Sequence, residues 1–269
     1  MSVLELFSGT RSVGKVCDEI GFKSVSVDLI MEADHKCDIM EFDYKQFPKD
    51  FFDVVWASPP CTAYSNLQNC WLNRERNGKV FTKEHMEEDR KEADKLVLKT
   101  LEIIDYFKPS LWFIENPQTG QLRNRYFMKD LPYYDVDYCM YSDWGYKKRT
   151  RIWTNKEHFD AKLCDGKGTC GNMVEIINEK KQLQHKTVLG NGYEMIDGKK
   201  TLCNTKEMRD KHRAKKQLLH KTNLGNTERL QKSTKQLRHS DNCILKGTGT
   251  NLMDRYRIPA RLIHDLLIG

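Results

Sequence analysis

The 269-residue sequence lacks the features of several large protein classes. It has no run of about 18 apolar residues, the length that a membrane-spanning helix requires, so we expect no membrane association. Its first residues, MSVLELFSGT, lack a basic segment followed by a long apolar run, and we expect no secretory signal. The nine cysteines are odd in number and irregularly spaced, which is not typical of a disulfide framework. We therefore expect a cytoplasmic or nuclear protein whose cysteines are thiols, a nucleophile or metal ligands.

Positive charge is concentrated in one part of the chain. Residues 155–250 contain 20 Lys and Arg against 11 Asp and Glu, whereas the remainder contains 25 against 27. Such a basic segment is typical of a surface that binds a polyanion, although a solvated, lysine-rich insert has the same composition. The segment also contains a duplication, because Lys180–Asn191 and Lys215–Asn226 are identical at ten of twelve positions. Two copies are too few for a solenoid and favour a duplicated recognition element, with a duplication that has no function as the alternative.

Residues 1–154 alternate short apolar runs with longer amphipathic ones, which is typical of an α/β fold whose helices cover a parallel sheet. Apolar residues spaced three and four apart predict a helix over Ala93–Phe107, which ends before Pro109. A final apolar helix is expected after Pro259 and should dock onto the main domain. The expected strands are Val3–Phe7, Ser24–Asp28, Phe52–Ala57, Leu111–Glu115, Tyr134–Met140 and Arg149–Thr154.

A turn of small residues and two acids indicate a nucleotide-like ligand. The segment LELFSGTRSVG places Ser8-Gly9-Thr10 between a strand and a helix. Such a turn lets a ligand approach the backbone and the helix N-terminus at the carboxyl end of the strand. Asp28 ends the second expected strand, where a carboxylate can accept hydrogen bonds from ribose hydroxyls. Asp38 can similarly accept one from an adenine amino group, although both acids also fit the roles of helix caps or loop acids.

A cysteine follows two prolines at the end of a buried strand. In FFDVVWASPPCTAYS the prolines rigidly present Cys61 at the same edge of the sheet as the glycine turn. The segment LWFIENP ends the next strand with Glu115, whose carboxyl group should emerge beside Cys61. In YKKRTRIW, Arg149 and Arg151 alternate along a strand, which points both guanidinium groups to one face.

In this order, the segments resemble those of the cytosine-C5 DNA methyltransferases that use S-adenosylmethionine. The glycine turn resembles the cofactor-binding motif of that family, SPPC its nucleophile loop, ENP its Glu-Asn-Val motif and KKRTR its Gln-x-Arg-x-Arg motif. The chain looks most like compact phage or large-virus members. The resemblance implies a Rossmann-like methyltransferase sheet in a catalytic and cofactor-binding domain at 1–154. A smaller, irregular and basic target-recognition region at 155–250 and a C-terminal helix at 251–269 would follow.

The resemblance also implies roles for individual residues. Cys61 would attack C6 of a cytosine flipped out of double-stranded DNA, and a protonated Glu115 would donate to N3. Arg151 would bind O2, and Arg149 the sugar-phosphate or the loop that bears Cys61. The cofactor-binding residues would be Phe7, Ser8, Gly9, Thr10, Asp28, Asp38 and Ile39, and the lysines that contact DNA would be Lys180, Lys181, Lys215 and Lys216.

The chain departs from the family pattern at several points. Thr62, Pro117 and Lys147 replace a glutamine, a valine and a second glutamine of the motifs, and none of these changes removes a reacting group. The closing Gln-x-Gly-Asn segment of the family is not recognisable, so cofactor contacts near the C-terminus are not assigned. Two alternatives stay open: an RNA or tRNA cytosine-5 methyltransferase with the same core, and a catalytically silent DNA-binding protein of the same fold.

The basic region contains cysteines and histidines that could bind zinc, which would stabilise a segment with little core. Their spacing is not that of a standard zinc finger, so unligated side chains in a basic loop region are the alternative. The candidate ligands are Cys164, Cys170, His185 and Cys203.

Overall fold

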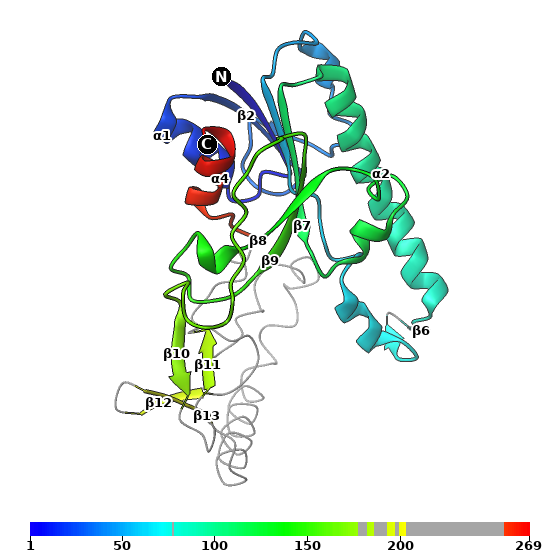
Figure 1. Ribbon diagram of the computed structural model, residues 1–269. Helices are drawn as coiled ribbons and strands as arrows, with labels where there is room; N and C mark the ends of the chain where they lie inside the picture. The colour runs from blue at the N-terminus through cyan, green and yellow to red at the C-terminus, as the bar shows by residue number, and fades with distance from the viewer. Residues whose placement is uncertain (77, 177–181, 186–192, 197–198, 203–255) are drawn as a thin grey trace, which may run out of the picture. The chain divides into compact units, whose positions relative to one another are not determined.

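The computed structural model describes residues 1–76, 78–176, 182–185, 193–196, 199–202 and 256–269 (Figure 1). The chain divides into two compact units. The first comprises Met1–Asp143, Lys147–Cys164 and Tyr256–Gly269, and the second comprises Trp144–Tyr146 and the described part of Asp165–Arg255. Within the described ranges, no helix is long and apolar enough to cross a membrane.

The first unit is built on a seven-stranded sheet with the strand order β3-β2-β1-β4-β7-β9-β8. The first five strands in this order pair in parallel, whereas β9 is antiparallel to both β7 and β8. The predicted sheet was parallel throughout; the antiparallel edge arises because the β8–β9 connection is too short for a crossover helix. The strands are β1 (Ser2–Leu6), β2 (Lys23–Asp28), β3 (His35–Lys36), β4 (Val54–Ala57), β7 (Leu111–Pro117), β8 (Tyr133–Asp137) and β9 (Arg149–Thr154).

Among the described residues, three α-helices cover this sheet: α1 (Ser12–Ile20), α2 (Lys83–Phe107) and α4 (Ala260–Leu267). The predicted helix that ends at Phe107 is confirmed, and it begins earlier than expected because Thr82 caps its first turn. The predicted C-terminal helix is also confirmed. It packs against α1, and the Ile258 amide donates a hydrogen bond of 3.2 Å to Ser12 Oγ (Figure 1).

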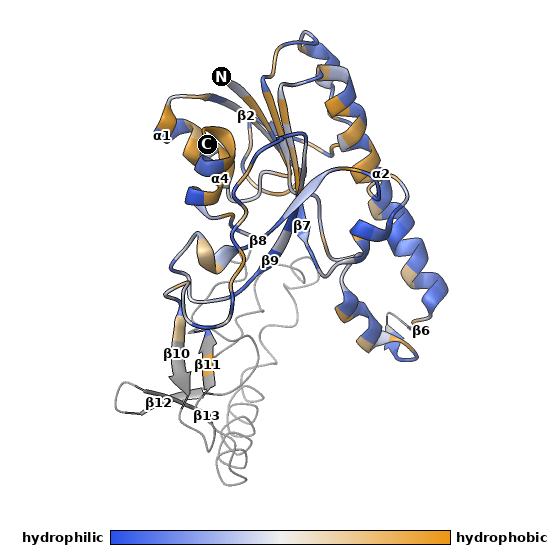
Figure 2. Ribbon diagram, in the orientation of Figure 1, coloured by the Kyte–Doolittle hydropathy of each residue, from blue (hydrophilic) through white to orange (hydrophobic). Residues whose placement is uncertain are grey.

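The core lies on both faces of the central strands. β4 is buried along its whole length, as is β1 apart from its first residue. Figure 2 shows the apolar residues gathered on these strands, on α1 and α4, and along the C-terminal half of α2. Burial on both faces explains why the strands appear in the sequence as continuous apolar runs rather than as alternating patterns.

One predicted strand ends earlier than expected. Tyr134–Met140 was predicted as a strand, but β8 ends at Asp137 and a 3-10 turn, η4 (Tyr138–Met140), follows. The Asp137 carboxylate accepts hydrogen bonds from the Cys164 amide and from Arg149, and Ser142 Oγ donates to the Tyr138 carbonyl. These contacts turn the chain out of the sheet.

The remaining elements are short. Three further 3-10 turns, η1 (Tyr44–Gln46), η2 (Asn66–Trp71) and η3 (Gln121–Asn124), lie in the first unit with the two-stranded β5 (Glu75–Arg76) and β6 (Lys79–Val80). The second unit contains β10 (Met173–Ile176), β11 (Gln182–His185), β12 (Tyr193–Ile196) and β13 (Lys199–Leu202), in the order β11-β10-β13-β12. The predicted DNA-binding lysines Lys180, Lys181, Lys215 and Lys216, and the zinc candidate Cys203, lie outside the described residues.

A buried acid joins β1 to the start of α1. Glu5 is 3% exposed, and its two carboxylate oxygens accept hydrogen bonds of 3.0 and 2.9 Å from the amides of Val13 and Gly14. Burial raises the pKa of Glu5 to about 7, although both hydrogen bonds act in the opposite direction. The sequence analysis did not single out Glu5; its signal is a lone acid within the apolar strand VLELF.

Replacing Glu5 with Gln should change the pH dependence of stability. The folded protein keeps the Glu5 proton up to a pH of about 7, whereas the unfolded chain loses it near 4.5, so this group makes the free energy of unfolding fall as pH rises through that interval. Glutamine does not titrate, so the variant lacks this loss. The free energy of unfolding of Glu5→Gln, relative to that of the wild type, should therefore rise by about 3 kcal/mol between pH 4.5 and pH 8. Urea denaturation of both proteins at the two pH values measures their free energies of unfolding. The prediction is contradicted if the wild type and Glu5→Gln differ by the same amount at both pH values.

Candidate active site

The predicted site residues follow the carboxyl ends of neighbouring parallel strands. The small-residue turn follows β1, Asp28 ends β2, Cys61 follows β4, and Glu115 lies near the end of β7. Since these strands are adjacent and parallel, their carboxyl ends meet at one edge of the sheet, where ligands bind in open α/β folds.

The turn after β1 is tied to Asp28. Its backbone is tightly coiled, with left-handed φ values of 56° at Phe7 and 51° at Gly9. The Gly9 amide donates a 2.8 Å hydrogen bond to Asp28 Oδ2, and the amides of Ile30 and Met31 donate to Oδ1 at 2.8 Å. Three amides thus orient the carboxylate at the sheet edge.

This turn also holds a polar atom that suits a ligand. The Ser8 side chain is buried, and its Oγ has no hydrogen-bond partner among the residues that the structure describes. A buried hydroxyl without a partner is costly, and a polar ligand would satisfy it. The ligand would bind at the turn rather than at the first amides of α1, because the amides of Val13 and Gly14 already donate hydrogen bonds to Glu5.

The other cofactor candidates lie partly in the core. Ile39 is 4% exposed and packs in the main apolar cluster, and Phe7 packs against the same cluster. Asp38 follows β3 and accepts a 2.9 Å hydrogen bond from the Met40 amide. The contacts of Phe7, Asp38 and Ile39 with a cofactor stay predictions. The same holds for Thr10.

The loop that carries Cys61 is held from two sides. Asn116 Nδ2, at the end of β7, donates a 2.9 Å hydrogen bond to the Pro59 carbonyl, and the Ser58 amide donates to the Leu6 carbonyl of β1 at 3.2 Å. Beyond the cysteine, the Tyr64 amide donates to the Cys61 carbonyl at 3.1 Å. The thiol is therefore presented by a backbone that is fixed before and after it.

A buried polar network supports the same loop. The fully buried Tyr64 donates its hydroxyl proton to Asp94 of α2 at 2.9 Å, and its carbonyl accepts from the Gln121 amide at 2.8 Å. Arg125 donates to the second oxygen of Asp94 and, at 2.7 Å, to Glu87. The sequence analysis did not identify this network, because its members come from segments far apart in the chain.

Glu115 is buried and has two polar partners that the sequence analysis missed. It is 7% exposed, and its Oε1 accepts a 3.0 Å hydrogen bond from the Tyr138 hydroxyl and lies 3.4 Å from Lys148 Nζ. The signal for Lys148 was its place in the KKRTR segment, one residue before Arg149. A carboxylate, a phenol and an ammonium group therefore meet at the end of β7.

These groups also act on the thiol of Cys61, which is partly exposed. Burial and the Glu115 carboxylate raise the pKa of Cys61, whereas the Lys148 ammonium group lowers it. The resting site therefore favours the neutral thiol, and Lys148 supplies the charge that eases its ionisation.

Arg149 and Arg151 each bind a carboxylate of β8. Arg149 donates to both oxygens of Asp137 at 3.0 and 2.7 Å, and Arg151 to both oxygens of Asp135 at 2.8 and 2.9 Å. The guanidinium of Arg151 also stacks 3.5 Å from the centre of the Tyr133 ring. The register of β8 and β9 places both arginines on one face, as predicted.

The arginines and Glu115 do not share a face. The register of β7 and β9 places Arg151 opposite Asn116, and Ile152 opposite Glu115. Residues directly opposite each other in an antiparallel pair point to the same side, so Arg151 lies on the face of Asn116. The cation that contacts Glu115 is Lys148.

The chain is similar to several known proteins. Residues 28–133 match the C-5 cytosine-specific DNA methylase family. Over 175 residues the chain is 44% identical to a "Probable DNA (cytosine-5)-methyltransferase" of Frog virus 3 (isolate Goorha), covering 64% of this chain and 79% of that protein. Solved structures that match include an Entamoeba histolytica methyltransferase, EhMeth, at 18% identity and a TM-score of 0.43, and a Spodoptera frugiperda DNMT2 mutant at 18% and 0.37.

The chain covers 55% and 53% of those two solved proteins, and each match covers 61% of this chain. The match to the viral relative extends over most of that protein. The chain belongs to the C-5 cytosine-specific DNA methylase family. The members of this family are DNA cytosine-5 methyltransferases that use S-adenosylmethionine.

Replacing Lys148 with Met should raise the pKa of the Cys61 thiol further, because it removes the positive charge that favours the thiolate. The rate at which iodoacetamide alkylates Cys61, followed by peptide mass spectrometry over a pH series, should then rise at a higher pH than in the wild type. Lys148→Arg retains the charge and should leave the profile in place, and the exposed Cys70 gives an internal reference. An unchanged profile in Lys148→Met would contradict the assigned influence of Lys148.

Proposed function

We propose that this chain transfers a methyl group from S-adenosylmethionine to C5 of a flipped cytosine in double-stranded DNA, through a covalent bond between Cys61 and C6. The observation that carries the proposal is the pairing of a rigidly held thiol with a buried carboxyl group. Asn116 ties the Cys61 loop to the end of β7, and Glu115 acts electrostatically on the thiol.

Each residue supplies one part of the chemistry. Cys61, once ionised, adds to C6 while Glu115 donates a proton to N3, which converts the ring into an enamine with a nucleophilic C5. This carbon then takes the methyl group. Loss of the C5 proton to a base such as water lets the C5–C6 double bond re-form and expels the Cys61 thiolate, while N3 returns its proton to Glu115. Tyr138 and Lys148 hold the Glu115 carboxyl group in place throughout.

The turn after β1 suits the cofactor, which supplies an electrophilic methyl group. The buried Ser8 hydroxyl has no partner in the described part of the chain, and the Asp28 carboxylate is oriented by three amides at the adjacent strand end. Asp28 would accept from the ribose hydroxyls, and Asp38 with Ile39 would meet the adenine. Phe7 would pack against the adenine ring.

Arg149 and Arg151 would meet the substrate from the β8–β9 edge. A guanidinium has five N–H donors, and each bidentate pair with a carboxylate uses two. Pairing fixes the orientation of the remaining donors at little entropic cost. Because the arginines and Glu115 lie on opposite faces of the sheet, Arg151 would hold the cytosine O2, and Arg149 the sugar-phosphate, with the base placed beyond the ends of β7 and β9.

The basic segment 155–250 would supply the affinity for DNA. Its excess of Lys and Arg matches the negative charge of the phosphate backbone, and Lys180, Lys181, Lys215 and Lys216 occupy equivalent positions in the two copies of the repeat. Because C6 is inaccessible in a stacked duplex, the target base has to leave the helix. The reaction would take place in the cytoplasm or nucleus, and for a viral protein in those compartments of the host cell.

Replacing Cys61 with Ser should abolish methyl transfer to a DNA duplex and leave cofactor binding nearly unchanged, because a hydroxyl is a much weaker nucleophile at neutral pH. A duplex with 5-fluorocytosine at the target should form a covalent adduct with the wild type, since fluorine blocks the final elimination. Cys70→Ser is the matched control and should retain both activities. Methylation by Cys61→Ser, an adduct on another cysteine, or methyl transfer to RNA but not to DNA would each overturn part of the proposal.

Replacing Asp28 with Ala should weaken S-adenosylmethionine binding by about 1–3 kcal/mol, the cost of leaving buried polar partners unpaired. Isothermal titration calorimetry with the cofactor measures this loss, and DNA affinity should barely change. Asp50→Ala, at an exposed position outside the site, is the control. Equal cofactor affinity in Asp28→Ala and the wild type would leave Asp28 with a purely structural role in the turn.

A further inference from the structure

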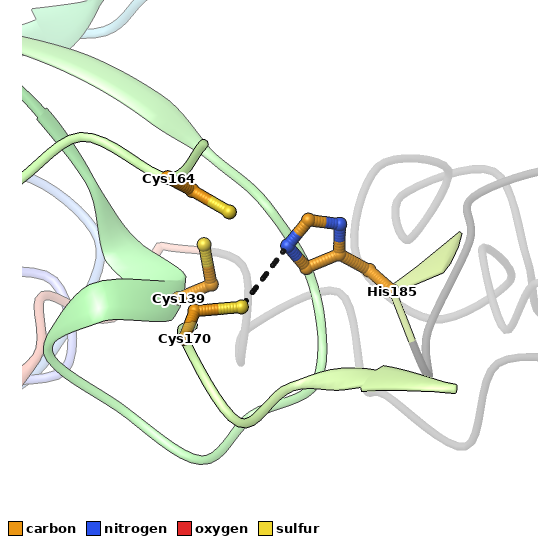
Figure 3. Close-up of side chains that lie close together, drawn as sticks. All are labelled: Cys139, Cys164, Cys170 and His185. Carbon is orange, nitrogen blue, oxygen red and sulfur yellow. Dashed lines mark hydrogen bonds between the residues drawn. The ribbon is translucent and has the colours of Figure 1, made fainter. Parts of the chain in front are cut away.

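The zinc candidates of the sequence analysis are divided between the two units of the chain. Cys164 belongs to the first unit, and Cys170 and His185 belong to the second. Within the second unit, Cys170 Sγ lies 3.7 Å from His185 Nε2, and a dashed line in Figure 3 marks this contact. These two side chains alone do not supply the four ligands of a structural zinc ion, so zinc binding stays a prediction.

A buried tyrosine lies just after Cys61, in the loop that presents the thiol. The Tyr64 amide donates a 3.1 Å hydrogen bond to the Cys61 carbonyl, which closes a turn over residues 61–64. The side chain of Tyr64 is fully buried, and its hydroxyl donates a 2.9 Å hydrogen bond to Asp94 Oδ1 of α2. Because the turn couples the two residues, the position of the Tyr64 ring influences where the Cys61 backbone lies.

The same turn is fixed to the segment that follows Glu115. Before the turn, the Pro59 carbonyl accepts the 2.9 Å hydrogen bond from Asn116 Nδ2. At its end, the Tyr64 carbonyl accepts a hydrogen bond of 2.8 Å from the Gln121 amide. The thiol therefore lies in a short span whose two ends are both bound to this segment.

Asp94 connects the turn to the same part of the chain through Arg125. Arg125 Nη2 donates to the second oxygen of Asp94, and Nη1 donates to Glu87 Oε1 at 2.7 Å. Burial and the hydrogen bond to Asp94 raise the pKa of Tyr64, so the phenol keeps its proton and remains a donor at neutral pH. Asp94 is itself buried, and a carboxylate with both oxygens bonded holds the hydroxyl in one direction.

We infer that Tyr64 and Asp94 are positioning residues for the nucleophile. The hydrogen bond between their side chains sets the distance between the Cys61 thiol and the carboxyl group of Glu115 during methyl transfer. The inference rests on the proposed function, in which the thiol has to reach C6 while the carboxyl group reaches N3 of the same ring. The base fixes the separation of these two atoms, so the protein has to hold the two groups at a matching separation. Tyr64 and Asp94 would act through Cys61 rather than on the substrate itself.

The competing explanation is that the network only fastens α2 to the first unit. The same helix offers a comparison, because the buried Tyr44 donates a 2.5 Å hydrogen bond from its hydroxyl to Glu102 of α2. Tyr44 lies in η1, between β3 and β4, whereas Tyr64 shares its turn with the nucleophile. A purely structural role predicts similar effects when either hydroxyl is removed. A positioning role predicts that methyl transfer falls for Tyr64 and not for Tyr44.

Tyr64→Phe removes the hydroxyl and keeps the ring, so the apolar packing of the loop is retained. The kcat for methyl transfer to DNA should fall about 10- to 100-fold, because a misplacement of about an ångström at the reacting atoms costs this much. The KM for S-adenosylmethionine should stay within about twofold of the wild-type value, since the cofactor would bind elsewhere on the sheet edge. Tyr44→Phe is the matched control and should retain the wild-type kcat.

A double-variant cycle tests whether Tyr64 and Asp94 act through their shared hydrogen bond. Asp94→Ala should lower kcat at least as much as Tyr64→Phe does. Adding Tyr64→Phe to Asp94→Ala should then have almost no further effect, because the hydrogen bond is already lost. Equal fractional losses from Tyr64→Phe in the wild type and in Asp94→Ala would show that the two residues act separately.

Alkylation of Cys61 by iodoacetamide tests the same inference without methyl transfer. Burial raises the pKa of the Cys61 thiol, so a released turn should expose the thiol and shift its alkylation to lower pH in Tyr64→Phe. This shift is opposite to the one expected for Lys148→Met. The buried Cys17 should stay unreacted, which separates release of the turn from general unfolding.

The outcomes separate this inference from the proposed function. A wild type without methyl transfer, in which Tyr64→Phe still shifts the alkylation of Cys61, would contradict the proposed function and support the positioning of the turn. The positioning role would be overturned by an unchanged kcat and alkylation profile in Tyr64→Phe, or by an equal loss in Tyr44→Phe. A loss that appears in the KM for S-adenosylmethionine instead of in kcat, or alkylation of Cys17 together with Cys61, would overturn it as well.

Discussion

The hydrogen bond from Asn116 Nδ2 to the Pro59 carbonyl, 2.9 Å long, joins the two strand ends on which the site depends. It ties the end of β7, which carries Glu115, to the loop after β4, which carries Cys61. Parallel neighbouring strands bring their ends to one edge, but the loops beyond them can take many directions. The hydrogen bond from the buried Asn116 side chain and a rigid pair of prolines restrict that freedom at the start of the Cys61 loop.

Buried carboxyl groups organise the rest of the first unit in the same way. Glu5 joins β1 to α1, Asp94 joins α2 to the Tyr64 loop, and Asp137 joins the end of β8 to Arg149 and Cys164. An unpaired buried acid is costly, so each one selects the backbone arrangement that supplies its donors. The site therefore rests on polar contacts between distant segments as much as on the apolar core beneath it.

Much of the fold was predictable because its signals are local. The apolar runs of β1, β2, β4, β7 and β9, the helix that ends at Phe107 and the helix after Pro259 depend on nearby residues, and the structure confirms them. The strand predicted over Tyr134–Met140 was wrong in its second half. It ends at Asp137 because this carboxylate accepts hydrogen bonds from Cys164 and Arg149, which are distant in sequence. Lys148 and Tyr138 were missed for the same reason.

The sequence by itself determined the α/β class, the order of the motifs and the residue types that the chemistry needs, since these depend on local periodicity and on composition. Only the tertiary structure decided which side chains meet. It placed Lys148 rather than an arginine on Glu115, and it turned the arginines to the other face of the sheet. Strand register and the directions of side chains set these contacts, and both arise from pairings between segments that are far apart in the chain.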